Sequence, residues 1–274
     1  MIDFLALFFG LVIGSFLNVC ILRLPREQSV VRPASRCPRC NASIRWYDNI
    51  PVLSFLLLRA KCRSCGLPIS WRYPLVEALN GMLYVGAVKW FGMGGEAVLV
   101  MLLCSALVVI TFIDFDFQII PDEISLPGMV IGLAAAPFFM TALMEPLPFG
   151  LSTVLPDGPY LRGLVNSVLG LLAGGAPLFL IGWLWQKLRK VEAMGGGDIK
   201  LMGMVGSFIG WQGALLTIML GALAGSLVGG VLILLKKHES GSYIPFGPFL
   251  AAGALASLFA GPEIIDWYFG LLRP

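Results

Sequence analysis

Two short stretches of the chain carry aspartates beside long apolar runs. Asp114 lies in "FIDFDFQIIPDEI", and Asp198 follows three glycines in "MGGGDIKLM". Two carboxyl groups held a few ångströms apart cannot both ionise, so they can share one proton. The neutral group can then donate a proton to a carbonyl oxygen while the ionised group takes one from an attacking water. If the fold brings Asp114 and Asp198 together, the sequence predicts chemistry of the aspartic-protease kind.

Each acidic residue near these stretches also has a simpler explanation. Asp122 precedes an apolar run, and N-capping of a helix accounts for it better than catalysis. Asp198 can equally be a helix cap, and Asp116 and Glu123 fit solvated positions at a membrane surface. Asp114 is harder to explain in this way, because it ends an apolar helix where the helix dipole disfavours an anion.

The residues around Asp198 narrow the possible chemistry. Gly195, Gly196 and Gly197 have no Cβ atoms, so an extended substrate backbone can approach the carboxyl group. The same loop lacks the Gly-Lys-Ser/Thr ending of a phosphate-binding loop. His238 is the only histidine and lies in the polar run "KKHES". Catalysis by a Ser/His/Asp triad is therefore not indicated.

The composition requires that these aspartates work at a membrane. The chain has 274 residues, of which 58% are hydrophobic and 13% charged, whereas soluble proteins carry about 25% charged residues. An all-α polytopic membrane protein follows. Ionisable residues at membrane depth are costly and are functional by default. The first residues lack a basic segment, so we expect a retained first span rather than a cleaved signal peptide.

We predict about eight transmembrane helices, because each crossing needs about 20 mostly apolar residues. The run Leu201–Leu235 is too long for one crossing, and we divide it at "GWQG", Gly210–Gly213, where glycine and an interfacial Trp favour a turn. The other predicted spans are Phe4–Leu22, Pro74–Gly94, Ala97–Ile113, Ile124–Met144, Gly163–Gln186 and Ser240–Pro262.

The basic residues orient these spans. Ten of the 19 Lys and Arg residues lie between Arg23 and Arg72. If that loop is cytoplasmic, 16 basic residues lie inside and three outside, as the positive-inside rule expects. We interpret the positive charge in this way and expect no nucleic-acid partner. Asp114 and Asp198 then fall at the same cytoplasmic face.

The loop between the first two spans contains two Cys-x-x-Cys pairs separated by 21 residues. This spacing indicates a structural four-thiolate zinc site, with Cys37, Cys40, Cys62 and Cys65 as ligands. Two disulfides are the alternative, but a cytoplasmic loop is reducing. We expect three parts: a first helix (1–22), a zinc-binding cysteine loop (23–73) and a membrane core (74–274). The basic cysteine loop would also attract acidic lipid headgroups.

The chain resembles the type IV prepilin peptidases over nearly its whole length. The cysteine pairs resemble that family's zinc domain, and "GGGDIKL" is similar to its GxGD motif. Further segments that carry the resemblance are "GLVIGSFLNVCILRLP" (Gly10–Pro25), "WRYPLVEALNG" (Trp71–Gly81), "IDFDFQIIPDEISLP" and "YIPFGPFLA" (Tyr243–Ala251).

The resemblance implies an aspartic endopeptidase of the bacterial inner membrane with Asp114 and Asp198 as the catalytic pair. Asp122, Gly195, Gly197 and Lys200 match supporting positions. It also implies removal of the basic leader of type IV prepilins and type II secretion pseudopilins, after a glycine and at the cytoplasmic face. The cysteine loop favours a second activity, N-methylation of the new terminus with S-adenosylmethionine, whose binding residues the sequence does not identify. A homo-oligomer is compatible with the sequence.

Two other functions compete with this interpretation. A proton-coupled transporter would use intramembrane aspartates as proton relays, but we find no internal repeat and the aspartates lie at span ends. A zinc-stabilised scaffold without catalysis is the second alternative. The Pro-rich loop Glu145–Tyr160 matches no motif, and its role is not predicted.

Overall fold

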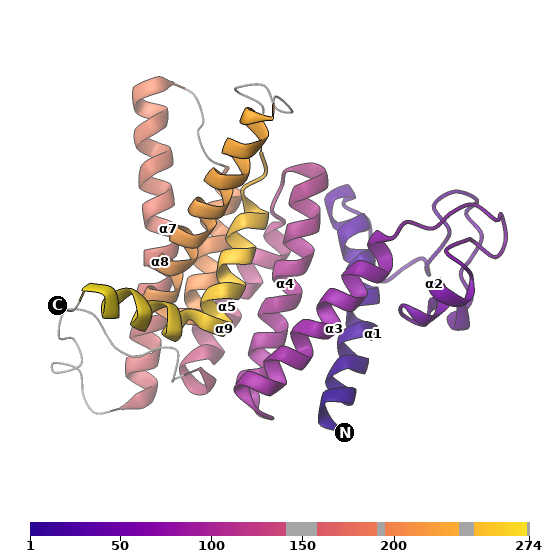
Figure 1. The fold of residues 1–274 in the computed structure, drawn as a ribbon, viewed down its shortest axis with the longest axis horizontal. Coiled ribbons are helices and arrows are strands. Elements are labelled where there is room, and N and C mark those ends of the chain that lie inside the picture. Colours follow the sequence, from indigo (N-terminus) through magenta and orange to yellow (C-terminus); the bar gives the residue numbers. More distant parts are fainter. Residues whose placement is uncertain (141–157, 191–194, 236–243, 273–274) are drawn as a thin grey trace. The chain divides into compact units, whose positions relative to one another are not determined.

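The protein is built from helices. A computed structural model describes residues 1–140, 158–190, 195–235 and 244–272 (Figure 1). Within these ranges the only β-structure is two isolated bridges in the cysteine loop. The chain forms two compact units, Met1–Ile113 and Asp114–Pro274. The three-part division expected from the sequence stays a prediction.

Each unit has its own set of helices. Unit 1 contains α1 (Ile2–Arg23), η1 (Leu24–Arg26), η2 (Trp46–Asn49), α2 (Leu53–Leu57), α3 (Arg72–Phe91) and most of α4 (Gly95–Phe117). Unit 2 contains the last turn of α4, together with α5 (Asp122–Phe139), α7 (Pro159–Arg189), α8 (Gly196–Leu234) and α9 (Gly247–Leu272). The predicted all-helical fold class is confirmed.

Unit 1 is held together by close packing and a buried polar network. A Cβ atom on Gly10 of α1 would lie 2.7 Å from the Gly81 Cα of α3, so the two backbones nearly touch. The Asn80 Nδ2 donates to the Gly10 carbonyl at 2.8 Å, and the Ser105 hydroxyl of α4 donates to the Asn80 Oδ1 at 3.1 Å. Tyr84 joins this network through its hydroxyl, 3.1 Å from that of Ser105. Buried polar groups are therefore paired across three helices.

Unit 2 centres on the packing of α7 against α8. A Cβ atom on Gly206 would lie 2.0 Å from the Gly170 carbonyl oxygen, which only two glycines permit. The Ser167 hydroxyl donates to the Ser207 carbonyl at 2.6 Å beside this contact. Small residues allow membrane helices to approach closely without a hydrophobic driving force between them.

Helix α8 is broken where the sequence predicted a turn. Gly210 has φ 74° and ψ −178°, a conformation outside the helical region that favours glycine. The side-chain oxygen of Asn166 accepts a hydrogen bond from the Trp211 N–H at 3.2 Å, which partly replaces the helical bonds lost at the break. The predicted division of this apolar run is confirmed.

Six of the described helices are long and apolar enough to cross a membrane by length and composition: α1, α4, α5, α7, α8 and α9. Helix α3 is not among these six, and the break at Gly210 divides α8 into two helices. If both are counted, the described residues contain the eight long helices that the sequence predicted. Large apolar side chains such as Phe4, Phe9 and Leu234 are exposed. Lipid tails would cover such a surface, so the protein is a multi-pass membrane protein.

Candidate active site and metal centre

Asp114 and Asp198 are both buried acids of unit 2. Asp114 lies in the last turn of α4 with 3% of its surface exposed, and Asp198 lies in the first turn of α8 with 5% exposed. The charge of Asp114 acts on Asp198, so the two carboxyl groups are electrostatic neighbours although 84 positions separate them in the chain. Such an arrangement favours one shared proton.

A second helix explains how Asp114 is tolerated at the end of α4. The Gly247 N–H donates to the Asp114 Oδ2 at 2.9 Å, and Gly247 is the first residue of α9. The free N–H groups and positive dipole at a helix start favour an anion. The start of α9 thus offsets the unfavourable end of α4 and fixes one carboxyl oxygen.

Gly247 lies in the segment "YIPFGPFLA", and the sequence alone predicts no role for it. The signal was present, because Pro248 follows it and proline is common at the first positions of a helix. The sequence did not predict that the start of this helix donates a hydrogen bond to Asp114. A Cβ atom on residue 247 would lie 2.7 Å from the Asp114 Oδ2, so glycine is required for the contact.

The capping roles considered for Asp198 and Asp122 are wrong. Helix α8 begins at Gly196 with Gly195 as its N-cap, and α5 begins at Asp122 with Pro121 as its N-cap. Asp198 and Asp122 thus lie inside the first turns of these helices and not at the cap positions. The carboxyl groups of both aspartates are therefore available for other interactions.

Asp122 pairs with Lys200 instead. The Lys200 Nζ lies 2.7 Å from each carboxylate oxygen of Asp122, which ties the start of α8 to the start of α5. The pair is partly exposed, so it adds little to overall stability. It nevertheless orients the first turn of α8, which carries Asp198.

The three glycines before Asp198 have different surroundings. A Cβ atom on Gly197 would lie 2.9 Å from the Ile120 Cβ, so packing requires that glycine. A Cβ atom on Gly196 would meet nothing within 4 Å, and one on Gly195 would lie 3.9 Å from the Asp198 Oδ2. The approach of a substrate backbone over Gly195 and Gly196 stays a prediction.

The four predicted cysteine ligands gather at one point of unit 1. Their sulfur atoms all lie within 4.8 Å of one another, close to the separation of roughly 3.8 Å that Zn–S bonds of about 2.3 Å give in a tetrahedron. The four thiols are free rather than paired in disulfides. Thiolate sulfur is a preferred ligand of zinc, and four of them leave no position for a substrate. The residues therefore fit a structural zinc ion.

The two cysteine pairs are held by the same backbone pattern. The Cys37 N–H donates to the Ala42 carbonyl, and the Asn41 N–H donates back to Cys37, each at 2.9 Å. In the second pair, the Cys62 N–H donates to the Leu67 carbonyl and the Gly66 N–H donates to the Cys62 carbonyl, again at 2.9 Å each. Asn41 and Gly66 both have positive φ, as tight turns of this kind demand. The sequence predicted the ligands but not this internal repeat.

Backbone donors prepare the second pair for metal binding. The N–H groups of Cys65 and Ser64 lower the pKa of the Cys62 thiol to about 7. For Cys40 the Ala42 N–H acts in the same direction, but partial desolvation and the neighbouring thiols raise its pKa to about 11. Zinc deprotonates thiols that it binds, so the charged cluster depends on the ion.

Replacement of Cys37 by serine is expected to remove bound zinc and unfold the cysteine loop while the spans stay inserted. The loop has little apolar core of its own, so metal binding supplies its folding free energy. Metal analysis of the purified protein would measure the loss, and limited proteolysis would detect the unfolded loop. Cys20→Ser in α1 is the control and should keep its zinc. Absence of zinc from the wild type would contradict the assignment.

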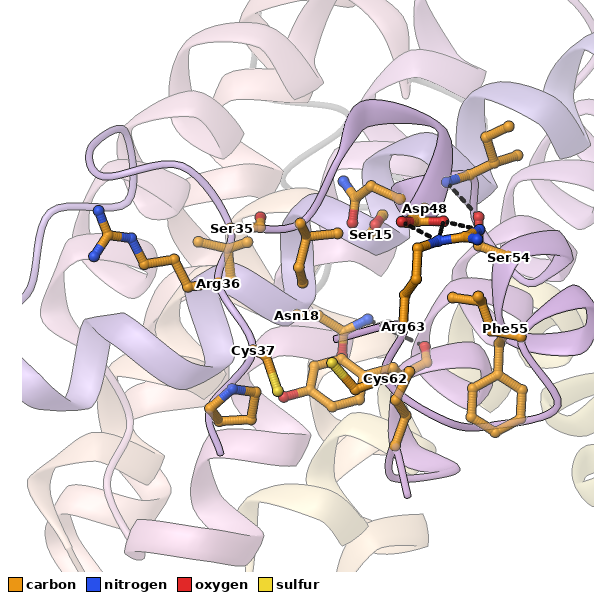
Figure 2. Close-up of a pocket in the computed structure, with 18 of the residues that line it drawn as sticks. Ser15, Asn18, Ser35, Arg36, Cys37, Asp48, Ser54, Phe55, Cys62 and Arg63 are labelled. Atoms are coloured by element: carbon orange, nitrogen blue, oxygen red, sulfur yellow. Dashed lines mark hydrogen bonds and ion pairs between the residues drawn. The ribbon is translucent and has the colours of Figure 1, made fainter. Parts of the chain in front are cut away.

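A cavity lies beside this metal centre, entirely within unit 1. It is walled by α1, the cysteine loop and α3, and Asn18 and Cys62 are among the residues that line it (Figure 2). Glu77 of α3 also lines it. Asp48 and Arg63 form an ion pair at its side, with the Arg63 Nη2 2.7 Å from the Asp48 Oδ1. The hydrogen bonds and positive charge of Arg63 lower the pKa of the Asp48 carboxyl, which therefore stays ionised.

Comparison with known proteins finds two family models that match successive parts of the chain. Residues 8–91 match the model of the bacterial peptidase A24 N-terminal domain, and residues 101–230 match that of the type IV leader peptidase family. No solved structure matches the chain.

Relatives named prepilin leader peptidase/N-methyltransferase match most of the chain. The Stutzerimonas stutzeri protein is 38% identical over 98% of this chain and 94% of its own length. The Pseudomonas aeruginosa protein is 36% identical over 94% of this chain and 90% of its own. The Myxococcus xanthus protein is 41% identical over 85% of this chain, which spans 63% of that relative. The chain therefore belongs to the type IV leader peptidase family.

Proposed function

We propose that this protein is a membrane aspartic endopeptidase that removes the basic leader of type IV prepilins and type II secretion pseudopilins after a glycine. The observation that carries the proposal is the pairing of two buried carboxyl groups, Asp114 and Asp198, within one unit. Family membership supports the substrate class, since the matched relatives are named prepilin leader peptidases.

The geometry supplies the parts that peptide hydrolysis needs. Asp114 is fixed by the Gly247 N–H, and Asp198 is presented by the first turn of α8. The protonated member of the pair donates to the carbonyl oxygen of the scissile peptide, and the ionised member takes a proton from the attacking water. Asp122 and Lys200 support the site by orienting the start of α8. Gly197 supports it by allowing α8 to pack against Ile120, and Gly195 by leaving room for the substrate backbone.

The site is proposed to face the cytoplasm from the bacterial inner membrane. The charge distribution supports this orientation, with 16 basic residues assigned to the inner side and three to the outer. A leader rich in basic residues would be retained on that side. Anionic lipid headgroups would contact the basic cysteine loop, and a homo-oligomer stays a prediction.

We also propose N-methylation of the new terminus with S-adenosylmethionine as the methyl donor. The names of the matched relatives include this activity, and the cysteine loop belongs to the matched N-terminal domain. The structural zinc ion would order that loop. The comparisons do not support the transporter alternative. A scaffold without catalysis would not need two buried, neighbouring acids.

The test is to incubate the purified protein with a prepilin and S-adenosylmethionine labelled in its methyl group. Mass spectrometry should show a pilin shortened by its leader, and the label should appear only in the shortened product. An unshortened prepilin would overturn the peptidase assignment. A shortened but unlabelled product would overturn the methylation alone.

Gly247→Ala is expected to lower the rate of cleavage by about 10²-fold, the cost of a small misplacement of a catalytic group. The added methyl would lie 2.7 Å from the Asp114 Oδ2 and would displace that carboxyl group. Gly230→Ala is the matched control, because a Cβ atom there meets nothing within 4 Å. Equal rates in the two variants would contradict the positioning role of Gly247.

A further inference from the structure

One arginine links the start of α3 to the last turns of α4. Arg72 is the first residue of α3, and its Nη2 donates to the Phe112 carbonyl of α4 at 2.8 Å. The guanidinium carbon also lies 5.0 Å from the centroid of the Phe112 ring, within the reach of a cation–π contact. Arg72 thus holds one residue of α4 by both its main chain and its side chain, and both residues belong to unit 1.

The end of α4 is electrostatically unfavourable without a cation. It carries Asp114 and Asp116, and the last turn of the helix contains no basic residue. The carbonyl end of a helix also carries negative partial charge, which a cation offsets. A carbonyl oxygen has two lone pairs, so that of Phe112 can accept from Arg72 in addition to a helical N–H. Arg72 therefore supplies from α3 the positive charge that the end of α4 lacks.

The backbone around Arg72 is itself held in place. The Trp71 ring lies 4.7 Å from the Phe55 ring of α2, centroid to centroid. On the other side, the Tyr73 carbonyl accepts a hydrogen bond from the Asn18 Nδ2 of α1 at 3.1 Å. The Arg72 Nε is shielded from solvent, and hydrogen bonds shielded from water are electrostatically stronger than exposed ones. The guanidinium therefore reaches α4 from a fixed base.

The residue that Arg72 holds lies close to a proposed catalytic acid along the chain. Phe112 stands two positions before Asp114 in the same helix, so a shift of the Phe112 main chain carries Asp114 with it. A misplacement of 1 Å can cost about 10²-fold in rate. The Gly247 N–H fixes one oxygen of the Asp114 carboxyl group, but the helix that carries this group has to be fixed separately.

We propose that Arg72 is a positioning residue for peptide cleavage, which acts through Phe112 and not on the substrate. It holds the end of α4 so that the Asp114 carboxyl group keeps the position in which it acts with Asp198. The inference rests on the proposed peptidase function and adds to it a residue that neither aspartate motif contains.

The test separates turnover from substrate binding. Arg72→Gln should lower kcat for prepilin cleavage by at least about 10-fold. KM should change by less than about 2-fold, because only an interaction that acts in the transition state is lost. Arg72→Met keeps an apolar contact with the Phe112 ring but has no donor, so it should show the same loss. Mass spectrometry of the shortened pilin at several prepilin concentrations would give both constants.

Two controls exclude a general effect on charge or fold. Arg72→Lys keeps a cationic donor for the Phe112 carbonyl and should restore most of the rate. Arg59→Gln makes the same change of charge as Arg72→Gln at an exposed arginine of the cysteine loop, and it should keep the wild-type kcat. Zinc content and helix content of the Arg72 variants should match those of the wild type.

The possible failures are distinguishable. Wild-type kcat in both Arg72→Gln and Arg72→Met would overturn the positioning role, as would an equally low kcat in Arg72→Lys. A raised KM with unchanged kcat would overturn it too, because Arg72 would then act in substrate binding. If the wild-type protein does not shorten a prepilin, the proposed function itself fails.

Discussion

Asp114→Asn and Asp198→Asn are each expected to lower the rate of prepilin cleavage by at least about 10³-fold, the scale seen when a member of a catalytic unit is removed. An amide keeps the shape of the carboxyl group but can neither release a proton to the substrate nor take one from water. Quantitative mass spectrometry of the shortened pilin would measure the rate. Because both acids act as one unit, the double variant should lose little more than either single one.

Asp116→Asn provides the control for this experiment. Asp116 is an exposed acid two positions from Asp114 in the same helical turn, and its replacement makes the same change of charge. It should cleave at the wild-type rate. Normal cleavage by either variant would disprove the catalytic assignment.

Gly206→Ala is expected to cause the largest loss of stability, lowering the melting temperature by about 5–10 °C. Its added methyl would lie 2.0 Å from the Gly170 carbonyl oxygen, and backbone atoms on both sides leave no flexible group to move. Helices α7 and α8 would have to separate, and their separation would also disturb the hydrogen bond between Ser167 and Ser207. Thermal unfolding in detergent, followed by circular dichroism, would measure the effect.

Gly230→Ala is the control in the same helix. Its methyl would meet nothing within 4 Å, so the lower conformational entropy of the unfolded chain should leave stability unchanged or slightly increased. Equal melting temperatures for the two variants would show that the contact between Gly170 and Gly206 does not limit stability.

The features predicted correctly from the sequence depend on local patterns. The lengths of the apolar runs predicted the helices, and the glycines and Trp at Gly210–Gly213 predicted the break in α8. The spacing of the cysteines predicted that four thiols lie together. Each of these signals lies within a few turns of chain. The orientation derived from the basic residues, which assigns Asp114 and Asp198 to the cytoplasmic face, stays a prediction.

The errors concern partners that are distant in the sequence. A capping role for Asp122 fitted its neighbours, but Lys200, 78 positions away, takes its carboxylate instead. The role of Gly247 depends on Asp114, 133 positions away. The loop Glu145–Tyr160 and His238 lie outside the described residues, apart from 158–160. Their predicted features stay open to test.

The hydrogen bond from Gly247 has a consequence for how this site can vary during evolution. The donor is a main-chain amide, which every amino acid except proline retains. Mutation at this position therefore leaves the donor in place and acts only through the volume of the new side chain. The acceptor, in contrast, is the side chain of Asp114, so replacement by a residue without a carboxyl group removes it. We therefore expect substitutions of Gly247, which slow the enzyme but keep the N–H donor, to be tolerated more readily during evolution than substitutions of Asp114.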